Sequence, residues 1–512
     1  MNLADLIDRN AAFTPDKPAL RFQGTVWSYA RLADRIDGLA RALASRLGVR
    51  RGDRVAVLAM NHPDILALLY ACARIGALLV PLNWRLAVPE QMFILTDAAV
   101  GVLIVAKEFA AVCEPLAAAS RETRIVGLDH APARSHSLDE LIEAGRWGAI
   151  ASVADLRTSL LIVYTAGTTG RPKGAVLTQD ALVCNAAMSQ HMHAMTGADH
   201  VLTVLPLFHV GGLNIQTTQA LQFGGTVTLH ERFLPAETLG AIARDRPTLT
   251  VLVPATIQAL TEHPAWAETD VSSLRAITTG STLVPQGLVD AIATRGVPVL
   301  QVYGATETCP IALYTRLGGD LSRPGSTGLP GLFCEARVID ETGREVPAGA
   351  AGEVAVRGPN VLAEYWRAPE ATAEALRDGW FHTGDIARRD AQGYFTIEDR
   401  KKNMIVSGGE NIYPAEIERV LLAHPAVAEA AVIGIPDPRW QEVPFAFVVS
   451  RAGAEASADG LRAHLQTQLA RFKLPRDFAF VDELPRNALG KVQHFRLKQA
   501  WRARLSALSD RR

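Results

Sequence analysis

The stretch that decides the fold is Leu160-Leu-Ile-Val-Tyr-Thr-Ala-Gly-Thr-Thr-Gly-Arg-Pro-Lys-Gly174. Its apolar start predicts a buried strand, which runs into a loop of three glycines, three threonines and one lysine. Glycines let backbone amides turn toward an anion, threonine hydroxyls add donors and lysine supplies charge, so the loop suits phosphate. It is not a Walker A loop, because Arg171 and Pro172 separate Lys173 from Gly170. On composition alone, a flexible surface turn is the alternative.

Apolar runs of strand length alternate with longer amphipathic segments over the first 310 residues. The predicted strands are 55–59, 78–81, 101–105, 160–165, 201–205, 226–229, 248–253, 274–278 and 297–302. Helices are predicted at 29–47, 236–244 and 285–295. This alternation predicts an α/β protein with parallel sheets that helices cover on both faces. Nine strands are more than a single sheet usually contains, so we expect two packed α/β subdomains.

The pattern changes after residue 325. Up to residue 400, glycines punctuate short β-rich pieces, which predicts a small antiparallel, β-barrel-like unit. A small α+β module follows, with its first clear helix from Pro414. The highly charged turn 398–402 lacks apolar anchors and is typical of a hinge. We therefore expect a large N-terminal domain over 1–401 and a small mobile C-terminal domain over 402–512.

The charge balance excludes several classes of protein. The 512 residues contain 52 Lys and Arg against 53 Asp and Glu, a formal charge of −1. With no basic excess to neutralise a phosphate backbone, we expect no nucleic-acid partner. Apolar residues make up 48% and charged residues 21%, which excludes a disordered or fibrous chain.

The sequence also predicts where the protein acts. The five cysteines show no CxxC or Cys/His metal spacing, which fits a reducing cytosol. The first ten residues contain two Asp and no apolar core of a signal peptide. The most hydrophobic stretch, 65–82, is interrupted by Arg74, Gly76 and Pro81, so we expect a buried helix and a strand there. We predict a cytoplasmic protein without integral membrane association; a homodimer stays open.

Six further motifs follow the 164–174 loop. They are Leu205-Pro-Leu-Phe-His209, Tyr303-Gly-Ala-Thr-Glu307, Trp380-Phe-His-Thr-Gly-Asp385, Asp399-Arg400, Ser407-Gly-Gly-Glu-Asn-Ile-Tyr-Pro-Ala-Glu416 and Pro485-Arg-Asn-Ala-Leu-Gly-Lys491. In this order and spacing they resemble the acyl-adenylate-forming (ANL) superfamily of acyl-CoA synthetases, peptide-synthetase adenylation domains and luciferases. The first 160 residues resemble it only in general texture. The resemblance implies that ATP activates a carboxylic acid to an acyl-adenylate, with pyrophosphate leaving.

The resemblance implies sites for ATP and Mg²⁺. The residues that would hold the β- and γ-phosphates are Thr165, Gly167, Thr168, Thr169, Gly170 and Lys173. Thr306 would bind the α-phosphate, and Glu307 with Thr168 would hold Mg²⁺, a hard cation that prefers oxygen ligands. Asp385 would accept the ribose hydroxyls with Arg400 beside it. The residues that would flank the adenine are Tyr303, Gly304, Gly280 and Ser281.

The resemblance also assigns residues to the two half-reactions. Lys491 would be the catalytic cation that the C-terminal module brings to ATP for adenylation. His209 would be a gate beside the carboxylate, and Lys402 the hinge. After rotation, Gly408 and Gly409 would line the pantetheine channel. Trp440 and Phe472 would contact coenzyme A, with simple packing as the alternative.

The acyl pocket is expected next to the His209 gate. Its expected lining is Phe208, Val210, Gly211, Gly212, Thr279, Ala305 and Cys309. Small residues dominate and no Arg or Lys is among them, so a second carboxylate would be buried without a partner. We therefore expect an apolar monocarboxylate, either a fatty acid or an aryl or cinnamate-type acid. Gly212 would leave tunnel volume that a tryptophan side chain would fill.

The predicted function is that of an acyl-CoA synthetase, an acid–thiol ligase. The acid and ATP give acyl-AMP and pyrophosphate, and coenzyme A then gives acyl-CoA and AMP. The alternative is a ligase that loads a carrier-protein phosphopantetheine in trans, and we expect no carrier module after residue 512, which disfavours it. The Ala- and Arg-rich chain disfavours a luciferase-like oxygenase, and the presence of Lys491 and Glu307 disfavours a degenerate binding protein.

Overall fold

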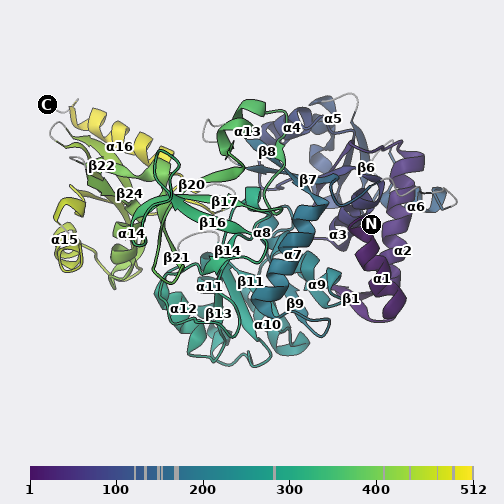
Figure 1. The fold of residues 1–512 in the computed structure, drawn as a ribbon, viewed down its shortest axis with the longest axis horizontal. Coiled ribbons are helices and arrows are strands. Elements are labelled where there is room, and N and C mark those ends of the chain that lie inside the picture. Colours follow the sequence, from purple (N-terminus) through teal and green to yellow (C-terminus); the bar gives the residue numbers. More distant parts are fainter. Residues whose placement is uncertain are drawn as a thin grey trace. The chain divides into compact units, whose positions relative to one another are not determined.

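The computed structural model describes residues 1–119, 123–131, 135–146, 150, 154–165, 172–280, 284–407, 410–437, 440–469, 471–486 and 490–509 (Figure 1). The chain forms two compact units, each described by itself below. The larger unit contains residues 1–336 and 355–382, and the smaller one 337–354 and 383–512.

The larger unit contains a seven-stranded sheet with the order β18-β8-β7-β4-β3-β5-β6. Its strands are β3 (Arg54–Leu58), β4 (Leu78–Pro81), β5 (Val102–Val105), β6 (Arg124–Gly127), β7 (Ser159–Thr165), β8 (Lys173–Thr178) and β18 (Glu364–Tyr365). The pairs among β3 to β7 are parallel, whereas β8 returns antiparallel along β7 and pairs with β18. The helices that accompany this sheet are α1 (Ala4–Phe13), α2 (Tyr29–Arg41), α3 (Pro63–Ile75), α4 (Val88–Asp97), α5 (Cys113–Ala119) and α6 (Leu138–Ala144).

Helix α3 accounts for the hydrophobic stretch near residue 70. Pro63 occupies its first turn, and Gly76, with a φ of +75°, ends it in the left-handed conformation. All of its residues are buried, and Arg74 forms ion pairs with Asp8 and Asp37. The predicted buried helix followed by a strand is confirmed. None of the helices among the described residues is both long and apolar enough to cross a membrane.

A second sheet of the larger unit has nine strands in the order β15-β14-β13-β12-β11-β9-β10-β1-β2. The strands are β1 (Pro18–Phe22), β2 (Thr25–Ser28), β9 (His200–Thr203), β10 (Thr226–Leu229), β11 (Leu249–Leu252), β12 (Ala276–Gly280), β13 (Val299–Tyr303), β14 (Leu313–Tyr314) and β15 (Leu329–Pro330). Helices α10 (Pro235–Asp245), α11 (Pro254–Thr261) and α12 (Gln286–Ala293) pack on one face through an apolar core. Helix α7 (Gln179–His193) and helix α9 (Thr217–Gln222) belong to the other face. The two predicted α/β subdomains are confirmed.

A small sheet contains the glycine-rich region after residue 325. Its order is β16-β17-β20-β19, with β21 on β20. Its elements are β16 (Glu335–Ile339), β17 (Ala351–Arg357), α13 (Pro369–Ala375), β19 (Leu376–Arg377), β20 (Trp380–Arg389) and β21 (Phe395–Arg400). The chain passes from one unit to the other within β16, β17 and β20.

The C-terminal residues form an α+β fold with the strand order β23-β22-β25-β24 and β26 on β25. The elements are β22 (Ile405–Ser407), β23 (Glu410–Ile412), α14 (Pro414–Leu422), β24 (Val427–Asp437), β25 (Gln441–Ser450), α15 (Ala458–Gln466), β26 (Phe478–Phe480) and α16 (His494–Ser509). Helix α14 begins at Pro414 as predicted, and Ile417, Val420 and Leu421 bury its apolar face in a core shared with α15. The predicted hinge at Lys402 concerns rotation and stays a prediction.

Candidate active site

Two strands hold the ends of the predicted phosphate loop. Strand β7 ends at Thr165 and pairs directly with Lys173 at the start of β8. The Tyr164 hydroxyl donates a 2.5 Å hydrogen bond to the Asp97 carboxylate. Burial is the main cause that raises the pKa of Tyr164, and the hydrogen bond to Asp97 is the next. Gly174 is needed for packing, because a side chain there would meet Ile162 and the Tyr164 ring. The four predicted residues Gly167, Thr168, Thr169 and Gly170 lie outside the described residues.

A tight turn follows the carboxyl end of β13. Gly304 has no room for a side chain, since a Cβ would collide with the Pro310 carbonyl. The Thr308 hydroxyl accepts a hydrogen bond from the Ala305 amide at 2.9 Å. The short helix η4 (Thr306–Thr308) then ends at Cys309, whose φ is +73°. Thr306 and Glu307 are therefore held at the carboxyl end of a parallel strand, where α/β sheets commonly bind ligands.

Glu307 and Lys173 meet at one aromatic side chain that sequence reasoning missed. The Tyr365 hydroxyl donates to Glu307 Oε1 at 2.8 Å, and Lys173 Nζ lies 5.4 Å from the centroid of the Tyr365 ring. A single held carboxylate fits Mg²⁺, which takes its other ligands from phosphates and water. The described residues contain no group of three or more His, Cys, Asp or Glu side chains that could hold a metal by themselves. No local pattern marks Tyr365, because it lies 58 positions from Glu307.

Gly280 closes the neighbouring strand. It pairs with Val302, and a Cβ at this position would collide with the Val302 carbonyl, so glycine lets β12 and β13 approach at their carboxyl ends. Tyr303 ends β13 beside it. Ser281 lies outside the described residues. The structure thus brings Gly280, Tyr303 and the turn after β13 together, as an adenine pocket would require.

His209 begins the short helix α8 (Val210–Asn214). Its Nδ1 accepts a hydrogen bond from the Gly211 amide at 3.0 Å, so a neutral His209 carries its proton on Nε2. The neutral ring can therefore donate to an acid oxygen. Near the end of α8, Asn214 Nδ2 lies 3.7 Å from the buried thiol of Cys309, whose pKa burial raises.

A cation lies against the aromatic residues next to the predicted gate, His209. Phe208 packs edge-on against Trp84 with ring centroids 6.4 Å apart. The Arg85 guanidinium lies 4.9 Å from the Trp84 centroid and 5.8 Å from that of Phe208, and burial lowers the pKa of Arg85. Sequence reasoning missed Trp84 and Arg85, which follow β4 far from the other lining residues in the chain.

Thr279 faces away from its neighbour on β12. The Thr278 hydroxyl contacts His193 of α7, whereas Ile277 packs with α10 to α12. Since side chains alternate along a strand, Thr279 shares the face of Ile277. Val210 is therefore part of α8 and Cys309 contacts its last residue, Asn214, whereas the side chain of Thr279 lies on the other face of the sheet.

A Gly212→Ala variant should have a free energy of unfolding about 1–3 kcal/mol lower than the wild type. Its activity should fall by the same factor on all acids. A Cβ at 212 would meet the backbone carbonyls of Leu205 and Pro206, which cannot turn aside. The expectation that this glycine leaves open tunnel volume therefore lacks support, because its missing side chain points into backbone. Urea unfolding and a panel of small and bulky acids test this.

The matched control is Gly211→Ala, whose Cβ would meet only the His209 ring, 3.1 Å from Nδ1. It should keep more stability than Gly212→Ala. Normal stability of Gly212→Ala with selective loss of bulky acids would show instead that Gly212 lines the acyl pocket.

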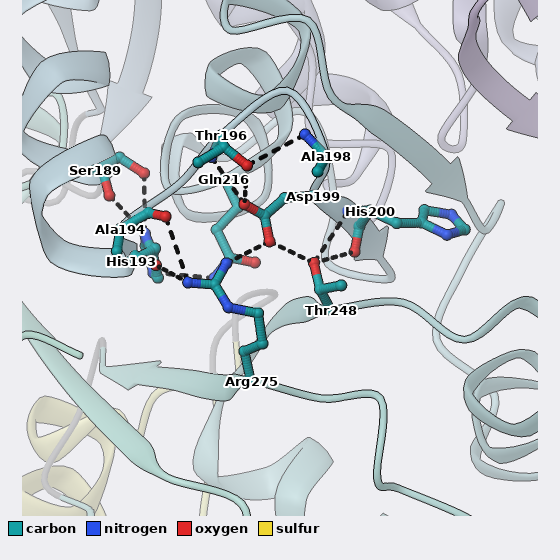
Figure 2. A network of polar contacts seen from close by, with 10 residues as sticks. All are labelled: Ser189, His193, Ala194, Thr196, Ala198, Asp199, His200, Gln216, Thr248 and Arg275. Carbon is teal, nitrogen blue, oxygen red and sulfur yellow. Dashed lines mark hydrogen bonds and ion pairs between the residues drawn. The ribbon is translucent and has the colours of Figure 1, made fainter. Parts of the chain in front are cut away.

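A buried polar network fastens α7 to the strands of the nine-stranded sheet (Figure 2). His193 Nε2 lies 2.8 Å from the Thr278 hydroxyl and 3.0 Å from Gln216 Nε2. Asp199 accepts from Thr248 at 2.7 Å and pairs with Arg275, which also donates to the His193 carbonyl at 3.2 Å. These bonds satisfy most of the polar groups of the buried His193 and Asp199, so they fix the strands that lead to Gly280.

His193 should make the protein less stable in acid. Burial is the main cause that lowers its pKa, and the Ser189 carbonyl and Asp199 oppose it while Arg275 adds to it, with a net value of about 4. Between the unfolded pKa of 6.5 and the folded value, the unfolded chain binds one more proton than the folded one. The free energy of unfolding therefore decreases as the pH decreases through this range. The expected loss from this group is about 2 kcal/mol between pH 7 and pH 5. Urea unfolding at both pH values measures it.

A His193→Gln variant is the control for that measurement, because glutamine does not titrate. Its free energy of unfolding should change about 2 kcal/mol less between the two pH values than that of the wild type. Equal pH dependence in both proteins would assign the acid sensitivity to other groups.

Asp385 and Arg400 are brought together by a hairpin of the smaller unit. The two residues are direct partners of β20 and β21, and Arg400 Nε lies 3.0 Å from Asp385 Oδ1. Asp385 is buried, and its amide donates to the Thr383 hydroxyl at 3.1 Å. Gly384 lies between Thr383 and Asp385 and has a φ of +70°, which glycine adopts without steric cost. The hairpin thus presents one held carboxylate and one guanidinium, which suits a vicinal diol.

Lys491 lies in a closed hairpin before α16. Arg486 and Val492 form an isolated antiparallel bridge, and the Gln493 amide donates to the Pro485 carbonyl at 2.8 Å. Arg486 also donates to the Gly490 carbonyl at 2.6 Å and pairs with Glu429. The stem of the hairpin is therefore held by backbone pairing and by Arg486.

The residues predicted to contact coenzyme A are only partly described. Trp440 is exposed, with its amide donating to the Asp437 carboxylate at 2.9 Å. Phe472 lies in the short helix η6 (Arg471–Lys473) and Lys402 in η5 (Lys401–Asn403). Gly408 and Gly409 lie outside the described residues. Their roles stay predictions.

Comparison with known proteins shows the family of this chain. The model of the family "AMP-binding enzyme" matches residues 7–366, and that of the "AMP-binding enzyme C-terminal domain" matches residues 416–491. The chain is 47% identical over 500 residues to the indoleacetate–CoA ligase of Aromatoleum aromaticum, and the match covers 98% of both proteins. It is 42% identical over 490 residues to the feruloyl-CoA synthase of an Amycolatopsis species, with 94% of this chain and 96% of that one covered.

A solved structure extends the agreement to the fold. The o-succinylbenzoate CoA synthetase of Bacillus subtilis, in complex with its acyl-adenylate intermediate, matches with a TM-score of 0.85 and 32% identity. The match covers 97% of this chain and 98% of that one. The predicted resemblance is confirmed: the chain belongs to the AMP-binding enzyme family, and it is an ATP-dependent acid–thiol ligase that makes acyl-CoA.

Proposed function

We propose that the acid this chain activates is an aryl-type monocarboxylic acid. The observation that supports this is similarity to an indoleacetate–CoA ligase and a feruloyl-CoA synthase over 98% and 94% of the chain. Each of those names refers to an acid with an aromatic ring and one carboxylate. The buried apolar residues Phe208 and Val210, which flank His209, and Cys309, which contacts Asn214 of α8, favour the same class of acid.

The first half-reaction joins an oxygen of the acid to the α-phosphorus of ATP and expels pyrophosphate. Two anions must approach, so positive charge and hydrogen-bond donors near the phosphates lower the barrier. We propose that Lys173 and Thr306 supply these from the larger unit and Lys491 from the smaller one. The neutral His209 would donate its Nε2 proton in a hydrogen bond to the acid carboxylate.

Glu307 would hold Mg²⁺ through a carboxylate oxygen, and Asp385 with Arg400 would hold the ribose. The ion would neutralise charge on the phosphates when bound. In the second half-reaction a carbon–sulfur bond to coenzyme A forms and the bond from the acyl carbon to AMP breaks. The proposed contacts to coenzyme A are Gly408, Gly409, Trp440 and Phe472. Lys402 is the proposed hinge between the two steps, and the cytoplasm is the proposed location.

Pyrophosphate release, measured with and without coenzyme A over a panel of acids, tests the proposal. The panel contains indole-3-acetate, ferulate, benzoate, octanoate and 2-succinylbenzoate. We expect release with the first two acids, and acyl-CoA only when coenzyme A is present. Turnover of octanoate alone would overturn the proposed aryl acid and indicate a fatty acid as the substrate. Preference for 2-succinylbenzoate would overturn the monocarboxylate and implicate Arg85.

A further inference from the structure

We propose that Tyr365 is a positioning residue that holds the carboxylate of Glu307 for the metal ion and the ammonium of Lys173 for the phosphates. This rests on the proposed function of those two residues. None of the seven motifs between residues 164 and 491 includes Tyr365, and its role follows from the tertiary structure.

The Tyr365 side chain serves two charged groups at once. Its hydroxyl donates to Glu307 Oε1 at 2.8 Å, and the ring lies under Lys173 Nζ, 5.4 Å from the centroid. Only 9% of the residue is exposed, so both contacts are largely shielded from water. A hydrogen bond to one carboxylate oxygen fixes the orientation of the other, which is the oxygen that a hard cation would use.

The two charged groups contact different parts of Tyr365, the carboxylate its hydroxyl and the ammonium its ring. Among the ion pairs of the described residues, none joins Lys173 to Glu307. A direct pair would neutralise both groups, and each would then have to lose its partner before binding a phosphate or a cation. With the aromatic ring as its neighbour, the ammonium keeps its charge for phosphates while the carboxylate keeps its charge for the metal.

The backbone around Tyr365 is fastened at both ends. The Leu362 amide donates to the Glu307 carbonyl at 2.7 Å, and the Trp366 amide to the Gly174 carbonyl at the same distance. Asn360 is fully buried and donates to the Thr308 carbonyl at 3.1 Å. Residues 360–366 therefore tie the exit of the phosphate loop to the turn that carries Glu307, and Tyr365 sits between these anchors.

The test compares Tyr365→Phe with Tyr365→Leu by Mn²⁺ electron spin resonance in the presence of α,β-methylene-ATP. Phenylalanine keeps the ring under Lys173 but removes the hydroxyl, so the Kd for Mn²⁺ should rise on the order of tenfold. The affinity for the nucleotide in EDTA should stay within twofold of the wild type. Leucine removes the ring as well and should weaken both Mn²⁺ and metal-free nucleotide binding.

Tyr314→Phe is the matched control, because its hydroxyl contacts His191 at 2.9 Å, away from Glu307. It should change the melting temperature like Tyr365→Phe yet leave Mn²⁺ binding unchanged. In turnover, Tyr365→Phe should raise the KM for Mg²⁺ on the order of tenfold and keep most of kcat at saturating Mg²⁺. Unchanged Mn²⁺ affinity of Tyr365→Phe, or equal loss of metal-free nucleotide binding, would overturn the positioning role.

The binding measurements need neither the acid nor coenzyme A, so the two proposals fail separately. A wild type that binds Mn²⁺ and nucleotide but turns over no acid would overturn the proposed substrate and leave Tyr365 supported by its variants. A wild type that binds no Mn²⁺ with the nucleotide would overturn the role of Tyr365 itself.

Discussion

Lys491→Ala is expected to lower the rate of acyl-AMP formation by a factor on the order of a hundred or more, because a cation aimed at developing charge contributes a few kcal/mol. Formation of acyl-CoA from preformed acyl-AMP should stay within about twofold of the wild type, since the proposed rotation removes the lysine before that step. The closed stem of the hairpin, from the bridge of Arg486 with Val492 to the bond of Gln493 with Pro485, should keep the variant folded. Rapid-quench measurements of each half-reaction separate the two rates.

Lys498→Ala is the control for this experiment, since Lys498 lies on α16, seven positions after Lys491. Both half-reactions of the control should match the wild type. Near-normal adenylation by Lys491→Ala would show that another group supplies the charge. Equal loss of both half-reactions would mean that Lys491 acts throughout the cycle.

Asp385→Ala should instead impair both half-reactions, because ATP and acyl-AMP carry the same ribose. Hydrogen bonds to a charged acceptor contribute about 1.5–3 kcal/mol each, so losing two of them should raise the KM for ATP on the order of a hundredfold. The KM for acyl-AMP should rise by a similar factor, with a smaller change in kcat. The hairpin should persist, because β20 and β21 pair through several residues besides Asp385.

The matched control removes a carboxylate of the same unit whose partner lies on the surface. Glu345 pairs with Arg389 at 2.7 Å and is half exposed, so Glu345→Ala should leave both KM values unchanged. A rise in KM for ATP alone would argue that Asp385 contacts the triphosphate rather than the ribose. Unchanged KM values in Asp385→Ala would exclude it from the nucleotide site.

The sequence by itself determined nine buried strands of the N-terminal region and the chemistry class. Each predicted strand of the first 310 residues is present, because a parallel strand covered on both faces must be apolar throughout and therefore stands out in the sequence. The helix from Pro414 could be predicted from its first-turn proline, and the buried segment near residue 70 from its nearly continuous apolar run. The motifs from 164 to 491 identified the family without any structure.

Tertiary structure alone decided which side chains act together and which glycines have space beside them. Gly212 was predicted to border open volume, yet its Cβ direction meets backbone carbonyls of residues 205 and 206. Arg85 lies over Phe208, although 123 positions separate them in the sequence. Tyr365 joins Lys173 to Glu307 from a third segment of the chain. Local sequence patterns indicate burial and turns. Contacts between distant segments form only when sheets and loops pack, so no periodicity or motif predicts them.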